Sequence, residues 1–135
     1  MKEYAFGLLV SGRALPESLR AALREMDIAT WTCESCQEVS TLLDQTHPQL
    51  VFTDTQLSDG SWRDVVNMAQ QATSPVNVIV VGRTADMQFY LSVIESGAFD
   101  YFVPPFELVP LQYVVRLAVE DVRGRRTTLA RMAVA

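Results

Sequence analysis

The sequence predicts an α/β protein in which five buried strands alternate with five helices. Its 135 residues are enough for one domain and too few for two ordinary ones. Hydrophobic residues make up 49% of the chain, which can fill a core and excludes disorder by composition. Short apolar runs alternate with longer segments of helical periodicity. This alternation favours βαβ units, so we expect a doubly wound parallel sheet between two helical layers, α/β/α.

The expected strands are short runs rich in Val, Ile, Phe and Tyr. Their hydrophobicity is continuous rather than alternating, which is typical of strands covered on both faces. They span residues 4–10, 28–33, 49–53, 76–81 and 98–103.

The segments between these runs place apolar residues three and four positions apart, as on one face of a helix. Pro16 and Glu17 suit the first turn of the first helix, and Gly97 suits the end of the fourth. The expected helices span residues 15–26, 34–46, 61–72, 86–96 and 107–122.

Charge and composition exclude several classes of protein. The net charge of −5 disfavours a general nucleic-acid binder, and no apolar run reaches the roughly 20 residues of a membrane span. The first residues lack the apolar stretch of a signal peptide, so we expect a cytoplasmic protein without membrane contact. Two cysteines make no disulfide framework, and His47 is the single histidine.

The character of the chain changes near Val122. Four arginines crowd the last stretch, so we divide the chain into a domain at 1–122 and a helix extension or connector at 123–135. The arginines suit a solvated helix end, where cations face the negative pole of the helix dipole. The start of a connector into another domain is the alternative.

Two stretches carry a resemblance to a known family. Residues 50–60 read LVFTDTQLSDG, a strand ending in an aspartate followed by a loop, and residues 95–106 read ESGAFDYFVPPF. In order, spacing and placement on the third and fifth strands they resemble the receiver domain of bacterial response regulators, over roughly residues 4–122. The resemblance implies a flavodoxin-like strand order, 2-1-3-4-5, and a non-enzymatic signalling domain of a two-component system.

The resemblance places Asp54 at the position of the family's phosphoacceptor. The family's acidic pair falls on Ser11 and Gly12, its Ser or Thr on Gly82, and its lysine on Pro104. These residues supply no carboxylate, hydroxyl or cation beyond the Ser11 hydroxyl, so we expect Mg²⁺ binding to be weak or absent. The pattern indicates a degenerate pseudo-receiver.

Four further residues are candidates for a role at this site. Trp62 stands where the family usually has glycine, and Arg83 either faces solvent or pairs with Asp54. Tyr101 matches the family's switch aromatic, which the missing side chain at position 82 would allow to lie permanently inward. Pro105 matches a proline that follows a cis peptide bond.

Three functions from different classes follow. The first is a phosphorylation-independent binding module that docks a protein partner or a second copy through residues 86–96, 98–103 and 107–122. A histidine kinase or a fused output domain is a possible partner. The second is a receiver phosphorylated on Asp54. The third is a thiol redox protein that uses Cys33 and Cys36, a C-x-x-C at the start of a helix.

Overall fold

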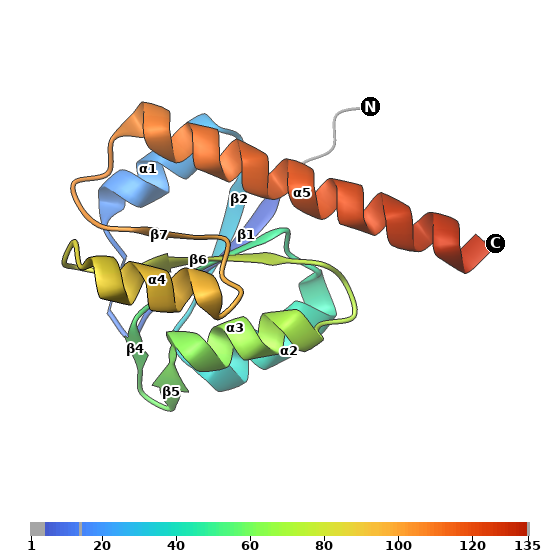
Figure 1. Ribbon diagram of the computed structural model, residues 1–135, viewed down its shortest axis with the longest axis horizontal. Coiled ribbons are helices and arrows are strands. Elements are labelled where there is room, and N and C mark those ends of the chain that lie inside the picture. The colour runs from blue at the N-terminus through green and yellow to red at the C-terminus, as the bar shows by residue number, and fades with distance from the viewer. Residues whose placement is uncertain (1–4, 14, 135) are drawn as a thin grey trace.

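The computed structural model describes residues 5–13 and 15–134. Five strands form one parallel sheet in the order β2-β1-β3-β6-β7 (Figure 1). They are β1 (Phe6–Val10), β2 (Ala29–Cys33), β3 (Leu50–Asp54), β6 (Asn77–Val81) and β7 (Asp100–Phe102). Counted along the chain this is the order 2-1-3-4-5, so the predicted flavodoxin-like sheet is confirmed.

The structure adds a small antiparallel hairpin that the sequence did not predict. Strands β4 (Gln56–Leu57) and β5 (Gly60–Ser61) pair directly after β3. The loop between them holds Asp59, whose carboxylate accepts from the backbone amides of Cys36 and Gln37 at 2.8 and 3.1 Å. The hairpin therefore fixes the start of the second helix.

Helices follow each strand of the main sheet. They are α1 (Glu17–Glu25), α2 (Cys36–Thr46), α3 (Trp62–Gln71), α4 (Met87–Glu95) and α5 (Leu108–Val134). Three of them begin at a side-chain cap: the Ser35, Ser61 and Asp86 oxygens accept amides of the first turn. The predicted starts of all five helices lie within two residues of the observed ones.

Two hydrophobic layers cover the sheet, one on each face. Leu8 of β1 packs with α2, α3 and α4, whereas its neighbour Leu9 packs with α1 and α5. This alternation follows from the strand period of two residues. The result is the three-layer α/β/α architecture that the sequence predicts.

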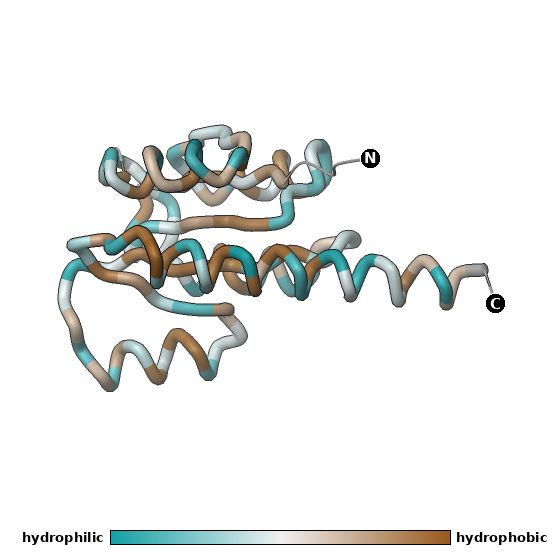
Figure 2. The backbone as a smooth tube through the Cα atoms, turned by 90° about the horizontal axis from the view of Figure 1, so that it is seen from above, coloured by the Kyte–Doolittle hydropathy of each residue, from teal (hydrophilic) through white to brown (hydrophobic). Residues whose placement is uncertain are grey.

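Helix α5 continues through the boundary expected at residue 122 and projects beyond the body of the domain (Figures 1 and 2). Arg126 holds it to the sheet, because its guanidinium donates to the carbonyls of His47, Pro48 and Pro75 at 2.9 Å. Arg125 donates to Asn77 at 2.7 Å. Arg125 and Arg126 thus contact the amino-terminal edge of the sheet instead of solvent alone.

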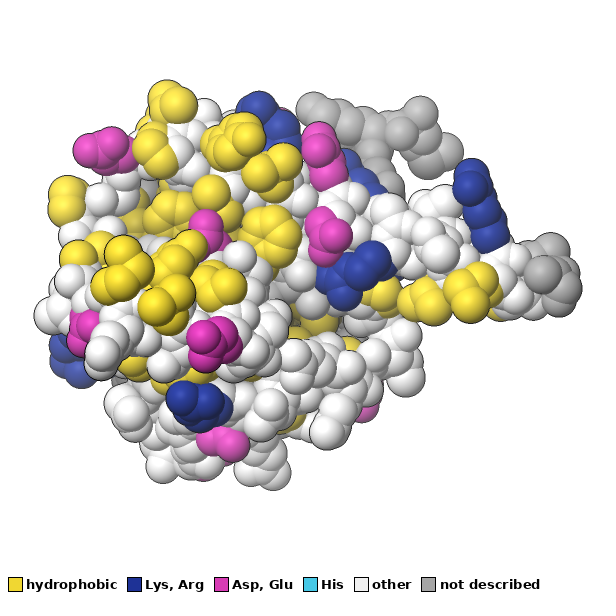
Figure 3. All heavy atoms as spheres, viewed as in Figure 1, with side chains coloured by type: hydrophobic (Ala, Val, Ile, Leu, Met, Phe, Trp, Pro, Cys, Tyr) yellow, Lys and Arg dark blue, Asp and Glu magenta, His cyan; other side chains and the backbone are white. Residues whose placement is uncertain are grey.

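Among the described side chains, nine large hydrophobic ones are exposed on α4 and α5, and seven of them lie on α4 and the first ten residues of α5. Figure 3 shows hydrophobic side chains gathered over this side of the molecule. The seven are Met87, Tyr90, Leu91, Leu108, Val109, Tyr113 and Leu117. Over the described ranges, no helix combines the length and apolar character that a membrane span requires.

Candidate functional site

Asp54 ends strand β3 at the carboxyl edge of the sheet, where ligands of such sheets bind. Its side chain is nearly buried, with 8% exposure. One carboxylate oxygen accepts from the Ser11 hydroxyl at 3.0 Å, and the other accepts from the Thr55 amide at 2.7 Å. The Ser11 oxygen also accepts from the Arg13 amide at 3.1 Å. Neutral donors therefore satisfy this carboxylate.

The other positions of the family site offer no second carboxylate. Gly12 and Pro104 are exposed, and an added Cβ at Gly12 would meet open space. Among the described residues, no three His, Cys, Asp or Glu side chains form a group able to hold a metal ion. Mg²⁺ prefers several oxygen ligands including carboxylates. The Ser11 hydroxyl donates to Asp54 and does not replace the missing second carboxylate. The residues present therefore do not fit a magnesium site.

Tyr101 fills the space that a side chain at position 82 would take. A Cβ added to Gly82 would overlap the Tyr101 hydroxyl and the adjoining ring carbons. The hydroxyl donates to the Thr84 carbonyl at 2.9 Å. Burial raises the pKa of Tyr101, and the negative charge of Asp86 adds to that rise. The ring thus lies inward, against the backbone of Gly82.

Aromatic side chains connect Tyr101 to the third helix. Its ring centroid lies 5.2 Å from that of Phe89 and 6.5 Å from that of Tyr90, both in edge-to-face geometry. Phe89 in turn lies 5.7 Å from Trp62. Trp62 is buried in the core, and the Arg63 guanidinium lies 4.6 Å above its ring. Trp62 of α3 therefore packs against α4 through Phe89. Its backbone amide donates to the carbonyl of Thr55, the residue after Asp54.

Arg83 does not pair with Asp54. Its side chain is exposed, and no hydrogen bond or ion pair joins it to another of the described residues. Of the two alternatives, the structure shows the solvent-facing arginine. The peptide bond between Pro104 and Pro105 is cis.

Both cysteines are buried and free of a disulfide. Burial raises the pKa of the Cys33 thiol to about 12, with the Glu38 charge adding to it. Burial likewise raises the pKa of Cys36 to about 11, with a further contribution from Asp59. A reactive thiol needs a lowered pKa. The thiols are therefore protonated near neutral pH, which argues against the redox function.

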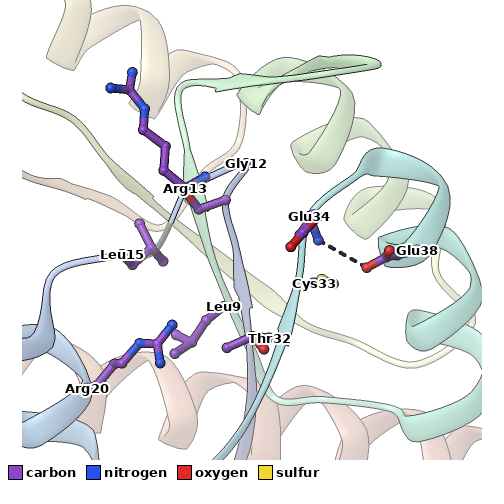
Figure 4. Close-up of a pocket in the computed structure, with 10 residues that line it drawn as sticks. Leu9, Gly12, Arg13, Leu15, Arg20, Thr32, Cys33, Glu34 and Glu38 are labelled. Carbon is purple, nitrogen blue, oxygen red and sulfur yellow. Dashed lines mark hydrogen bonds between the residues drawn. The ribbon is translucent and has the colours of Figure 1, made fainter.

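A cavity of about 600 Å³ lies beside Ser11 and Gly12, between the ends of β1 and β2 (Figure 4). Arg20 of α1 lies on one side, and Glu34 and Glu38 lie on the other. The sequence interpretation missed Arg20, because nothing in the helical pattern distinguishes a residue facing a cavity from a solvated one. Because Arg20 is positive and Glu34 and Glu38 are negative, the cavity favours neither a metal ion nor a simple anion.

Comparisons with known proteins agree with this geometry. The chain is 28% identical to the response regulator protein PilR of Pseudomonas aeruginosa over 103 residues, which are 76% of this chain and 23% of that protein. It is 34% identical to the sensory transduction protein LytT of Bacillus cereus over 63 residues, 47% of this chain and 25% of that protein. The matches thus cover about a quarter of these relatives.

Solved structures show the same fold. The signal receiver domain of a putative Luxo repressor protein from Vibrio parahaemolyticus superposes with a TM-score of 0.78 at 21% identity, covering 93% of this chain and 98% of that one. The receiver domain of NtrC4 from Aquifex aeolicus gives 0.73 at 19% identity, covering 87% and 98%. The sequence model of the response regulator receiver domain matches residues 13–116. Because that match spans most of the chain, this protein belongs to the response regulator receiver domain family.

Proposed function

We propose that this receiver domain is a protein-interaction module that works without ordinary metal-assisted phosphorylation of Asp54. The observation that carries the proposal is the place of Tyr101 in the space beside Gly82. In the family, as the resemblance implies, this aromatic residue changes rotamer on activation and a Ser or Thr is its partner. Here ring packing and the hydrogen bond to the Thr84 carbonyl hold the ring inward, so no phosphoryl group is needed to draw it in.

The surroundings of Asp54 support the same proposal. Phosphoryl transfer requires that a cation and fixed positive groups neutralise the charge that develops on the phosphoryl oxygens. Pro104 supplies neither a charge nor an amide donor, and the Ser11 hydroxyl already donates to the Asp54 carboxylate at 3.0 Å. An incoming phosphoryl group would therefore meet one carboxylate with no compensating charge.

The face formed by α4, β7 and α5 is the proposed docking surface. Met87 is 70% exposed and Val109 72%, and the same two helices also expose Tyr90, Leu91, Leu108, Tyr113 and Leu117. Exposed apolar patches of this kind mark protein interaction sites. The candidate partners are a second copy, another protein such as a histidine kinase, and a fused output domain. A non-enzymatic role in the cytoplasm remains a prediction from the sequence.

Intact-protein mass spectrometry tests the chemical part of this proposal. The protein is incubated with Mg²⁺ and acetyl phosphate, beside an Asp54→Ala variant and a phosphorylatable receiver domain as positive control. We expect no mass gain in the wild-type protein. A gain of one phosphoryl group that is lost in Asp54→Ala would overturn the proposal and establish the alternative, a phosphoacceptor receiver.

A further inference from the structure

Strand β2 is an edge of the sheet, and nothing on it blocks further pairing. It pairs with β1 alone, and Ala29 to Thr32 are exposed on both faces. Trp31 at its centre is 58% exposed. Edge strands in natural proteins usually carry charges, prolines or bulges that prevent edge-to-edge contact. The five residues of β2, ATWTC, contain no charge and no proline.

The direction of the backbone groups follows from two hydrogen bonds. The Ala29 amide donates at 3.2 Å to Ala5, just before β1, and the Cys33 carbonyl accepts at 3.0 Å from the residue just after β1. The backbone groups of alternate residues point to opposite sides of a strand. The amides and carbonyls of Thr30 and Thr32 therefore point outward, away from the sheet.

The next outward-facing amides on either side are already engaged. The Ile28 amide donates to the Leu23 carbonyl at 3.0 Å. The Glu34 amide donates at 3.0 Å to the Glu38 carboxylate, as the dashed line in Figure 4 shows. The open part of the edge is thus confined to the two threonines and Trp31 between them.

We infer that β2 is a homodimer interface, in which it pairs antiparallel with β2 of a second copy about a twofold axis at Trp31. In this register Thr30 lies opposite Thr32 of the second copy. Each such pair exchanges two backbone hydrogen bonds, and the twofold axis gives two such pairs, about four bonds in total. Trp31 then lies opposite Trp31 of the second copy, in a non-hydrogen-bonded pair, where side chains approach most closely.

Other registers use the edge less well. A pairing centred on Thr30 would require the Ile28 amide, and one centred on Thr32 would require the Glu34 amide. Both amides are engaged within the protein. The register centred on Trp31 is the one that pairs both open threonines at once.

Charge and side-chain packing agree with the same register. Asp27 falls opposite Ser35 of the second copy, and Glu34 falls opposite Ile28, so no like charges face each other. A groove of about 360 Å³ beside Trp31, on the outer side of α2, leaves room for the indole of the second copy. A twofold contact closes on itself, so it forms a dimer rather than a fibre.

This surface is independent of the docking face proposed above, because β2 and β7 lie at opposite edges of the sheet. Sedimentation velocity from about 10 µM to about 1 mM tests the inference, since a short edge contact is expected to be weak. We expect a dimer at the higher concentrations, accompanied by a blue shift of Trp31 fluorescence. Monomer throughout the range, for folded protein, would overturn the inference.

Three variants locate the contact. Trp31→Lys should give monomer at every concentration. Thr32→Pro leaves the indole in place and removes an outward amide, which an edge strand tolerates, so we expect dimerisation at least about tenfold weaker. Tyr113→Lys, on α5 of the α4–β7–α5 face, is the matched control and should dimerise normally. Dimerisation that is lost in Tyr113→Lys and kept in the two β2 variants would overturn the inference and assign the contact to the α4–β7–α5 face.

Disulfide trapping tests the register, and circular dichroism checks that each variant is folded. In a Cys33→Ala, Cys36→Ala background, Trp31→Cys should oxidise to a covalent dimer, because position 31 faces itself. Thr30→Cys should not, since the register offsets position 30 from its own copy by two residues, beyond disulfide reach. The reverse pattern would exclude the proposed pairing.

Discussion

Replacing Gly82 by alanine tests whether the missing side chain at position 82 is what lets Tyr101 lie inward. The backbone at Gly82 lies outside the left-handed region, so alanine is not strained by its own conformation. The added Cβ would nevertheless overlap the Tyr101 hydroxyl and ring. The tyrosine is a side chain that can rotate, so we expect it to turn outward while the strand stays in place.

The cost of that rotation follows from the contacts that Tyr101 loses. Its hydroxyl gives up the hydrogen bond to the Thr84 carbonyl, which contributes about 1 kcal/mol. Its ring gives up the edge-to-face contacts with Phe89 and Tyr90, about 0.5 to 1.5 kcal/mol each. Alanine also lowers the entropy of the unfolded chain, which offsets about 0.4 to 1 kcal/mol. We expect Gly82→Ala to lower the free energy of unfolding by about 2 kcal/mol.

Urea denaturation measures this free energy, and NMR of a ring-labelled Tyr101 reports its position. Gly12→Ala is the matched control, because nothing lies within 4 Å of an added Cβ there. In a Tyr101→Ala background, Gly82→Ala should cost close to nothing, since the overlapping ring is gone. An unchanged Tyr101 signal together with a stability within about 0.5 kcal/mol of the wild type would refute the reasoning.

Four further predictions concern the extension of α5 and the thiols. Arg126→Ala should lower the free energy of unfolding by about 2 kcal/mol and speed amide exchange in residues 127–134, because its guanidinium holds carbonyls of three residues; the exposed Arg131→Ala should do neither. Gly124→Ala should raise the free energy of unfolding by about 1 kcal/mol, since glycine is unfavourable inside a helix and an added Cβ meets open space; a loss in urea melts would contradict this. Cys33 and Cys36 should react with Ellman's reagent near neutral pH only as fast as the protein unfolds, and rapid labelling of folded protein would count against the buried thiols. Because their pKa values rise from 9.0 to about 12 and about 11 on folding, the stability they contribute is complete below pH 9.0 and is lost as the pH rises through 11 to 12; Cys33→Ala should flatten that loss in urea melts at alkaline pH.

The sequence predicted the main sheet because continuous apolar runs have few alternatives to parallel strands. The burial expected for all five strands was wrong at β2, where Ala29 to Thr32 are exposed because β2 is an edge of the sheet. It missed the β4–β5 hairpin, whose strands of two residues carry no hydrophobic pattern. It assigned residues 123–135 to a helix extension or connector and took the arginines there as typical of a solvated helix end. Arg126 instead donates to carbonyls whose distance along the chain, 79 residues for His47, hides the contact from any local pattern.

For the candidate site, the sequence likewise located some residues but not the contacts between them. Position along the chain was enough to locate Asp54 at the end of β3 and Gly82 directly after β6. The hydrogen bond between Ser11 and Asp54 joins residues 43 positions apart and depends on the register of two strands. The overlap between Gly82 and the Tyr101 ring likewise required the rotamer of the tyrosine, which composition and spacing do not specify.

The hydrogen bonds of Arg126 fix the rotation of the last part of α5 about its own axis relative to the sheet. Each residue of an α-helix advances about 1.5 Å and turns about 100°, so the eight residues of 127–134 extend the axis by about 12 Å. A reporter or domain joined to this helix therefore takes its orientation from the number of intervening residues. Removing four residues turns it by about 40° from its original side, whereas removing two turns it about 200°, to the opposite side. The sheet thus acts as a fixed angular reference for whatever the helix carries.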